Sequence, residues 1–269
     1  MVKKKNGKSD LLRFFSNFSL QQKTPLFAYT LTFLFFLSCG IEEYPSVLPV
    51  PQSNITQVFN DYAEVRIPGS SSYYSPTTHF LVFYRIYVSD VPVSSTTFSD
   101  FASYSAINSA LSSDFNSIRP YIDSDTLINV NMDSMFRGRG YRTLCLSDPL
   151  EIDNILNSSI QGKTIIFNFP SSRIPFITID SIEYTLWRSN GNGTYNPVPD
   201  RLFLNRPDLY NPDNLIPQTN ADVMNKSNMS GTDRYTYAAM YIVAVGIDNA
   251  TYSNIYSTPA LIHVFLLPD

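Results

Sequence analysis

The segment "HFLVFYRIYVSD", residues 79–90, carries the strongest structural signal in the chain. Successive side chains of a strand point to opposite faces of a sheet, and both sets are largely apolar here. One face would carry Phe80, Val82, Tyr84, Ile86 and Val88, and the other Leu81, Phe83, Arg85 and Tyr87. A strand that is apolar on both faces must be covered on both sides. The segment therefore predicts a central strand in a layered β fold.

Short alternating segments of the same kind recur along the chain between turns rich in Pro, Asn, Gly and Ser. This pattern is typical of an antiparallel sandwich. The expected strands cover residues 63–67, 79–90, 140–147, 163–169, 176–187, 235–247 and 255–265. Sharp turns are expected at "NGNG", residues 190–193, and at "DNATYSN", residues 248–254. We predict a mainly β fold, an elaborated antiparallel β-sandwich that contains one or two inserted helices.

One inserted helix is predicted near residues 97–118. Its apolar side chains recur at steps of three and four residues, which is the spacing of one helix face. They are Tyr104, Ile107, Leu111, Phe115 and Ile118. Proline lacks the backbone N–H that a helix interior needs, so the helix is expected to end at Arg119, before Pro120.

A second, shorter helix is predicted to begin at Asp148. Asp148 suits the capping position, Pro149 suits the first helical position, and Glu151 completes a capping box. The segment 189–233 is rich in Asn, Pro and Asp, which predicts a long loop with at most a short helix near residues 221–226. No sharp change in composition divides residues 52–269, and we expect them to form a single domain.

The C-terminal segment resembles the last two strands of a fibronectin type III domain. In that family a tyrosine-bearing strand runs into Ala-Val, a polar hairpin follows, and Ser-x-Pro leads into the final strand. The matching residues here are Tyr235 or Tyr237, Ala244, Val245, Ser257, Pro259 and the strand from Leu261 to Val264. The segment "VFYRIYV", residues 82–88, is similar to the third strand of the family. The resemblance implies a fibronectin III-like or immunoglobulin-like sandwich.

Residues 1–38 have the organisation of an export signal peptide. A basic region comes first, followed by an apolar run from Leu26 to Ser38. The basic residues are Lys3, Lys4, Lys5, Lys8, Arg13 and Lys23. The apolar run is shorter than the roughly 20 residues that a helix needs to span a bilayer, so a spanning anchor is not expected.

A lone cysteine, Cys39, follows the apolar run directly. The stretch from Phe36 to Cys39 resembles a bacterial lipobox, with the small residue Ser38 before the cysteine and Gly40 after it. The resemblance implies that a signal peptidase cuts between Ser38 and Cys39 and that Cys39 carries acyl chains such as palmitate. An ordinary secretory signal with a coincidental cysteine is the other interpretation. The lack of an A-x-A-like cleavage site favours the lipobox.

The signal and the segment that follows it resemble those of uncharacterised lipoproteins of spirochaetes, treponemes in particular. This resemblance implies a cell-envelope location, with the lipid bilayer as a partner through acylated Cys39. Gly40, rather than Asp, after the cysteine favours the outer membrane and leaves the leaflet open. Three prolines in residues 39–51 predict an extended tether that reaches at most about 40 Å, at ~3.1 Å per residue.

The part of the chain after the signal is acidic. The full sequence has 19 Lys and Arg against 23 Asp and Glu, and many of the basic residues lie in the signal. Lys163 and Lys226 are the lysines that remain downstream. A nucleic-acid partner requires a basic surface and is therefore not expected. The isolated "RGRG", residues 137–140, is interpreted as a Gly-rich turn entering a strand rather than as an RNA-binding patch.

No segment identifies a reaction. The sequence lacks HExxH, GxSxG, GxGxxG and GxxxxGK[ST] motifs. His79 and His263 lie among apolar strand residues and are predicted to pack rather than to bind a metal. Cys145 is predicted to be a small buried side chain rather than a nucleophile. The acidic stretch 123–125 with Asn129 is interpreted as a solvated turn rather than a calcium site. We predict no catalytic residue, cofactor or metal.

Two classes of function fit this sequence. We favour a non-enzymatic envelope protein whose loops bind a protein or a glycan, because loop tyrosines make contacts at low entropic cost. The loop tyrosines are Tyr73, Tyr74, Tyr195, Tyr210, Tyr252 and Tyr256, and each could instead cap an end of the sandwich. The alternative is a hydrolase of envelope or host glycans that uses a pair of carboxylates, which the sequence does not single out.

Overall fold

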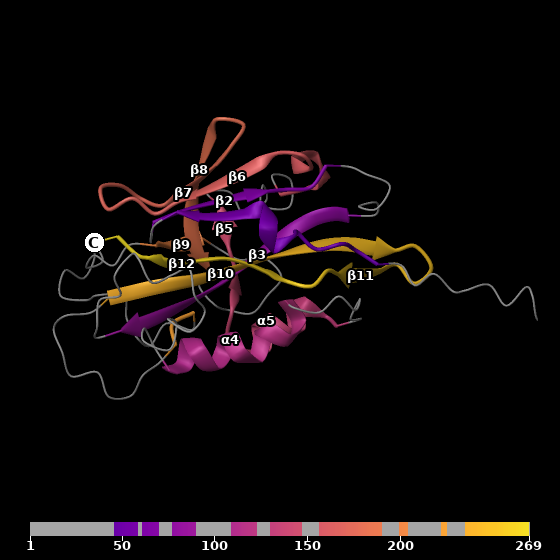
Figure 1. Cartoon of the computed structure of the whole chain (residues 1–269), viewed down its shortest axis with the longest axis horizontal. Coiled ribbons are helices and arrows are strands. Elements are labelled where there is room, and N and C mark those ends of the chain that lie inside the picture. Colours follow the sequence, from indigo (N-terminus) through magenta and orange to yellow (C-terminus); the bar gives the residue numbers. More distant parts are fainter. Residues whose placement is uncertain are drawn as a thin grey trace, which may run out of the picture. The chain divides into compact units, whose positions relative to one another are not determined.

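The computed structural model describes residues 46–58, 61–69, 77–89, 109–122, 130–146, 156–189, 199–203, 222–224 and 235–268. Residues 45–269 form one compact unit. Two antiparallel sheets and two helices make up the described part of this unit (Figure 1). The structure thus confirms a mainly β fold of the sandwich type with inserted helices.

The larger sheet has seven strands in the order β1-β2-β6-β7-β8-β5, and β9 also pairs with β8. These strands are β1 (Ile55–Val58), β2 (Tyr62–Arg66), β5 (Cys145–Leu146), β6 (Thr164–Asn168), β7 (Phe176–Ile179), β8 (Ile182–Ser189) and β9 (Pro199–Leu202). The smaller sheet has the order β11-β10-β3-β4, and β12 also pairs with β10. Its strands are β3 (Thr77–Ser89), β4 (Arg142–Thr143), β10 (Tyr235–Asp248), β11 (Ser253–Tyr256) and β12 (Ala260–Leu266).

Strand β3 is central, as its two apolar faces predicted. It pairs with β10 from Thr77 to Ser89 and with β4 on its other side. The face with Phe80, Tyr84 and Ile86 belongs to the core that lies between the two sheets. The opposite face, which includes Phe83 and Tyr87, belongs to a second apolar cluster that also contains helix residues. The molecule therefore has three layers in the order sheet, sheet and helices (Figure 1).

Helix α4 (Ser109–Ile122) packs Leu111, Phe115 and Ile118 into the second cluster. The predicted helix over 97–118 is confirmed from residue 109 onward, and residues 97–108 lie outside the described residues. The predicted end before Pro120 is wrong. Tyr121 and Ile122 pack partly against the same cluster, and this contact favours one more helical turn despite the lost N–H. Within the described residues, no helix is long and apolar enough to cross a bilayer.

Helix α5 (Met132–Gly138) was not expected from the sequence. Asn131 caps it by accepting a hydrogen bond from the Ser134 N–H (2.9 Å). Phe136 of α5 stacks on Phe83 with their ring centroids 4.6 Å apart, which fixes the helix on the sheet. Of the predicted Gly-rich turn over residues 137–140, Arg139 and Gly140 form a turn, in which Gly140 has a φ of 81°, whereas residues 137 and 138 belong to α5. This turn leads into β4.

Several predicted strands are divided in the structure. The segment 140–147 changes sheets, because β4 pairs with β3 and β5 pairs with β8. The segment 176–187 is a hairpin, β7 and β8, whose turn residues Asp180 and Ser181 have φ of 51° and 67°. The last predicted strand is divided into β11 and β12. The predicted loop 189–233 contains strand β9, and residues 222–224 are not helical.

The predicted helix beginning at Asp148 and the "NGNG" turn lie outside the described residues. Two short 3-10 helices complete the described elements, η1 (Gln52–Asn54) and η3 (Ser158–Ile160). In η3, Asn157 caps the start by accepting a hydrogen bond from the Ser159 N–H (2.8 Å).

Residues 46–51, the last part of the predicted tether, belong to the folded unit. Val47 and Val50 are 2% and 3% exposed and lie in the core between the sheets. Gln52 then donates to the Leu261 carbonyl (2.8 Å) and accepts from the Leu261 N–H (3.1 Å). The side-chain amide of Gln52 thus forms hydrogen bonds with the backbone N–H and carbonyl of Leu261 at the free edge of β12. The predicted tether therefore ends before the compact unit that begins at residue 45.

Candidate functional site

The predicted lipidation residues, Ser38, Cys39 and Gly40, lie outside the described residues. Acylation of Cys39 therefore stays a prediction from the sequence. The acidic stretch 123–125 and Asn129 also lie outside the described residues.

The two histidines lie in separate strands. His79 is in β3, where Nδ1 is 3.0 Å from the Thr78 hydroxyl. His263 is buried in β12, with its ring centroid 5.0 Å from that of Phe265. Cys145 is buried, and its Sγ lies 3.8 Å from the Thr143 carbonyl, in agreement with the predicted small core side chain. Across the described residues, no group of His, Cys, Asp and Glu is arranged to hold a metal ion.

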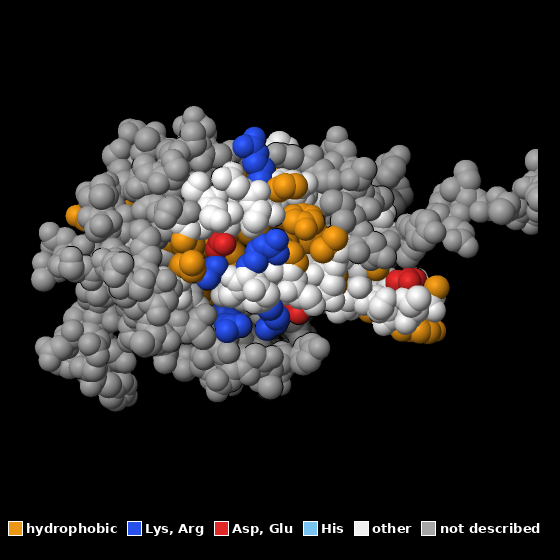
Figure 2. Space-filling view, turned by 90° about the horizontal axis from the view of Figure 1, so that it is seen from below, with side chains coloured by type: hydrophobic (Ala, Val, Ile, Leu, Met, Phe, Trp, Pro, Cys, Tyr) orange, Lys and Arg blue, Asp and Glu red, His pale blue; other side chains and the backbone are white. Residues whose placement is uncertain are grey.

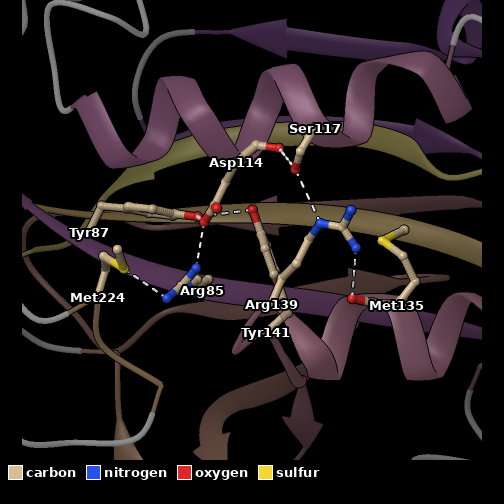
Figure 3. Close-up of polar contacts among 8 residues, drawn as sticks. All are labelled: Arg85, Tyr87, Asp114, Ser117, Met135, Arg139, Tyr141 and Met224. Carbon is tan, nitrogen blue, oxygen red and sulfur yellow. Dashed lines mark hydrogen bonds and ion pairs between the residues drawn. The ribbon is translucent and has the colours of Figure 1, made fainter.

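A polar cluster joins α4 to the central strand (Figure 3). Asp114 of α4 forms an ion pair with Arg85 of β3 and accepts a hydrogen bond from the Tyr87 hydroxyl (2.6 Å). The Tyr87 and Tyr141 hydroxyls are 3.0 Å apart. On its other side the Arg85 guanidinium donates to Sδ of Met224 (2.7 Å). A charged strand residue among apolar neighbours is thus compensated by a helix carboxylate.

A second arginine, Arg139, is linked to the cluster through Ser117, whose hydroxyl donates to the Asp114 carbonyl (2.7 Å; Figure 3). Its Nε donates to the Ser117 hydroxyl of α4 (3.1 Å), and Nη1 donates to the Met135 carbonyl of α5 (3.2 Å). Arg139 therefore joins the two helices. Gly140 beside it has a φ of 81°, which residues with a side chain rarely adopt, and a Cβ there would lie 3.2 Å from the Arg85 guanidinium.

The two tyrosines of the cluster remain protonated over a wide pH range. Burial raises the pKa of Tyr87 well above its usual value, and the negative charge of Asp114 raises this pKa further. Burial is also the main cause of the raised pKa of Tyr141, with Tyr87 next. The hydroxyls therefore act as hydrogen-bond donors rather than as bases. This arrangement holds α4 on the sheet and does not suit proton abstraction.

We expect these tyrosines to make the body sensitive to alkali. A phenol whose pKa is higher in the folded chain contributes stability that is complete below the unfolded value, near pH 10, and is lost as pH rises above it. The free energy of unfolding should therefore fall above pH 10 more steeply in the wild type than in Tyr87→Phe/Tyr141→Phe. The expected difference is up to about 1.4 kcal/mol per pH unit for each tyrosine. If the free energy of unfolding had the same pH dependence in both proteins from pH 8 to 11, the prediction would be contradicted.

A second polar cluster lies between the sheets. Asp222 receives two hydrogen bonds from Arg188 of β8, one from Nε (2.8 Å) and one from Nη2 (2.7 Å). The Tyr84 hydroxyl of β3 donates to the same carboxylate (3.0 Å). Arg188 and Asp222 are each only 2% exposed. Asp222 therefore holds a segment of the predicted loop against both sheets at once.

Sequence reasoning missed both clusters. The available signal was a charged residue within an apolar strand, Arg85 in β3 and Arg188 in β8, because a buried charge needs a partner. The partner could not be named, since Asp114 and Asp222 are 29 and 34 residues away along the chain. These residues meet only in the folded chain, and their separation along the sequence follows no motif that would identify them as partners.

Several carboxylates of the described residues form hydrogen bonds or ion pairs with neighbouring side chains. Each pairs with an Arg, Lys, Tyr or Thr side chain. The pairs are Glu64 with Tyr62, Asp114 with Arg85, Asp133 with Arg137, Asp180 with Lys163, Glu183 with Arg173, Asp222 with Arg188, and Asp248 with Thr251. A glycoside hydrolase places two carboxyl groups on either side of a substrate, whereas in each of these pairs a carboxylate faces a hydrogen-bond donor.

Two of the six loop tyrosines lie among the described residues, and they differ. Tyr256 is half-buried and packs against the helix-side cluster. Tyr252 lies in the turn between β10 and β11 and is 86% exposed. The end-capping interpretation fits Tyr256, whereas Tyr252 remains available for contact with another molecule.

No family model matches the chain, and no curated protein or solved structure shows significant similarity to it.

Proposed function

We propose that this chain is a lipid-anchored protein of a bacterial cell envelope, attached to the outer membrane, whose body binds a partner without catalysing a reaction. The observation that carries the proposal is the apolar run from Leu26 to Ser38 that ends directly at Cys39. Two or more acyl chains on one cysteine give durable attachment, because each buried methylene contributes about 0.8 kcal/mol.

The architecture of the body supports a binding role over catalysis. Its two polar clusters, around Asp114 and Asp222, link structural elements to one another. Two packed sheets and a helical layer form a rigid frame, and loops on such a frame commonly carry binding residues. The core includes Val47, so that few residues separate this frame from Cys39. Residues 40–45, fully extended at ~3.1 Å each, would reach about 20 Å.

Cys39→Ala is expected to abolish acylation of the chain. The full-length protein would be labelled metabolically with a palmitate analogue, and the label would be followed in the wild type and in the variant. Cys145→Ala is the matched control, because Cys145 is the second of two cysteines in the sequence and is buried. The control should keep the label and the membrane attachment.

Label that remains on Cys39→Ala would contradict the proposed anchor, as would label lost in Cys145→Ala. Release of the variant into the soluble fraction, or its retention as an uncleaved precursor, is the expected companion result. Separation of inner from outer membranes tests the placement. Recovery of the wild-type chain with the inner membrane would contradict an outer-membrane location.

A further inference from the structure

The turn between β10 and β11, residues 249–252, is joined by hydrogen bonds to Asp248. The Asp248 carboxylate accepts hydrogen bonds from the Ala250 N–H (2.8 Å) and the Thr251 hydroxyl (2.6 Å). The Asp248 carbonyl accepts from the Tyr252 N–H (2.7 Å). The Thr251 hydroxyl also lies 2.6 Å from that of Ser253. The turn is therefore organised before any partner arrives.

Tyr252 is an unusual residue for its position in this turn. Its φ is 55°, in the left-handed region that Gly and Asn adopt far more readily than a bulky side chain. Its side chain gains little from packing, because 86% of the residue is exposed. A glycine would satisfy the backbone better. The fold does not account for a tyrosine here, and strained residues of this kind are often found at functional sites.

We propose that the β10–β11 turn is a protein-binding element in which the Tyr252 ring inserts into a pocket of a folded protein partner. This inference rests on the proposed function, since it names the partner class and the contact of that binding body. Exposed tyrosine flanked by Asn, Ser and Thr is the composition of protein-binding loops. The adjacent Ile247, 39% exposed, would add apolar contact at the edge.

The shape of the turn favours a protein over a glycan. Sites that enclose small ligands are concave, whereas a hairpin turn is convex and cannot enclose a sugar. The partner must therefore supply the concavity. In Figure 2 the turn lies at the right-hand end of the described surface, where hydrophobic and acidic side chains are adjacent.

Charge at the turn disfavours insertion into a membrane. The hydrogen bonds that Asp248 accepts from Thr251 and Ala250 lower the pKa of its carboxyl group. The carboxylate therefore stays ionised beside Tyr252. An ionised acid is costly to bury among lipid chains and is repelled by anionic headgroups.

Site-specific photo-cross-linking tests the proposal first. A benzophenone amino acid would replace Tyr252 in the full-length chain, in its native cells. Ile182 is the matched control position, because it is also apolar, exposed (55%) and next to a hairpin turn. We expect a discrete protein adduct from position 252 that position 182 does not give. Adducts with lipid or glycan, equal adducts from both positions, or no adduct would overturn the proposal.

Binding measurements with the cross-linked protein, once identified and purified, give the second test. The chain with Tyr252→Gly should bind at least tenfold more weakly than the wild type, whereas Tyr252→Phe should bind within a few-fold of it. Tyr252→Gly relieves the backbone strain, so its thermal unfolding midpoint should be unchanged or higher. If Tyr252→Gly bound the partner with the same affinity as the wild type, the proposal would be overturned. Because the variant keeps its thermal stability, misfolding would not explain a loss of binding.

The outcome of these tests at position 252 does not depend on whether the proposed lipid anchor is correct. An acylated chain that gives no adduct at position 252 overturns the role of the turn and leaves the lipid anchor intact. A chain that is not acylated at Cys39 but gives the adduct overturns the anchor alone.

Discussion

Asp222→Ala is expected to lower the free energy of unfolding of the body by about 3–5 kcal/mol. The variant removes the carboxylate that faces the buried Arg188 guanidinium, and with it an acceptor of the Tyr84 hydroxyl. Loss of the opposite charge costs more than the ion pair contributes, because the buried arginine has given up water and no longer faces a carboxylate in return. Urea denaturation followed by far-ultraviolet circular dichroism measures the change.

Two comparisons separate burial from charge pairing. Glu183→Ala breaks the Arg173–Glu183 pair, whose side chains are 54% and 48% exposed, and it should cost less than about 1 kcal/mol. Arg188→Met/Asp222→Leu removes both buried charges and should be far less destabilising than Asp222→Ala alone. A loss below about 1 kcal/mol for Asp222→Ala would show that water reaches Arg188 and that the cluster is not buried as described.

The layered β fold could be predicted because its signals are local. Apolar side chains on both faces of residues 79–90 required cover on both sides, and β3 has a sheet on one side and helices on the other. The alternation in 63–67 and 163–169 likewise predicted β2 and β6, which pair with each other. Side-chain periodicity reports burial directly, so these elements follow from the sequence.

Features that depend on a few residues or on distant pairing were missed. Strands β4 and β5 have two residues each, and between them the Leu144 N–H still donates to the Val82 carbonyl of β3 (2.8 Å) before Cys145 pairs with Trp187 of β8. The β7–β8 turn uses Asp180 and Ser181 in left-handed conformations that Gly or Asn more commonly adopts. Asp180–Ser181 lacks the glycine that usually marks a two-residue hairpin turn.

The candidate sites also differ in how much of each could be predicted from the sequence. Lipidation of Cys39 stays a prediction from the sequence motif, because it would depend on enzymatic processing rather than on the fold. Tyr252 could be placed in a hairpin turn from "DNATYSN", but its left-handed backbone and its exposure come from the structure. The fibronectin III resemblance anticipated a hairpin and a break at Ser-x-Pro, which appear between β10 and β12. Membership of that family stays a prediction.

A body that begins at Gln52 is expected to be about 3–6 kcal/mol less stable than one that begins at Ser46. The longer body keeps Val47 and Val50, which are almost fully buried between the sheets. Removing each buried valine loses about 1.5–3 kcal/mol of apolar burial. The shorter body would also expose neighbouring core side chains to water. Denaturant unfolding of the two bodies under identical conditions measures the difference.

Point variants in the longer body distinguish burial from chain length. Val47→Ser/Val50→Ser should reproduce most of the loss, whereas Ser53→Ala, at an exposed position, should have little effect. Equal stability of the two bodies would show that residues 46–51 act only as a tether. If the loss is found, the proposed anchor at Cys39 would connect directly to the core between the sheets. A pull on Cys39 would then act first on Val47 and Val50, and next on the Gln52 contacts that cover the edge of β12.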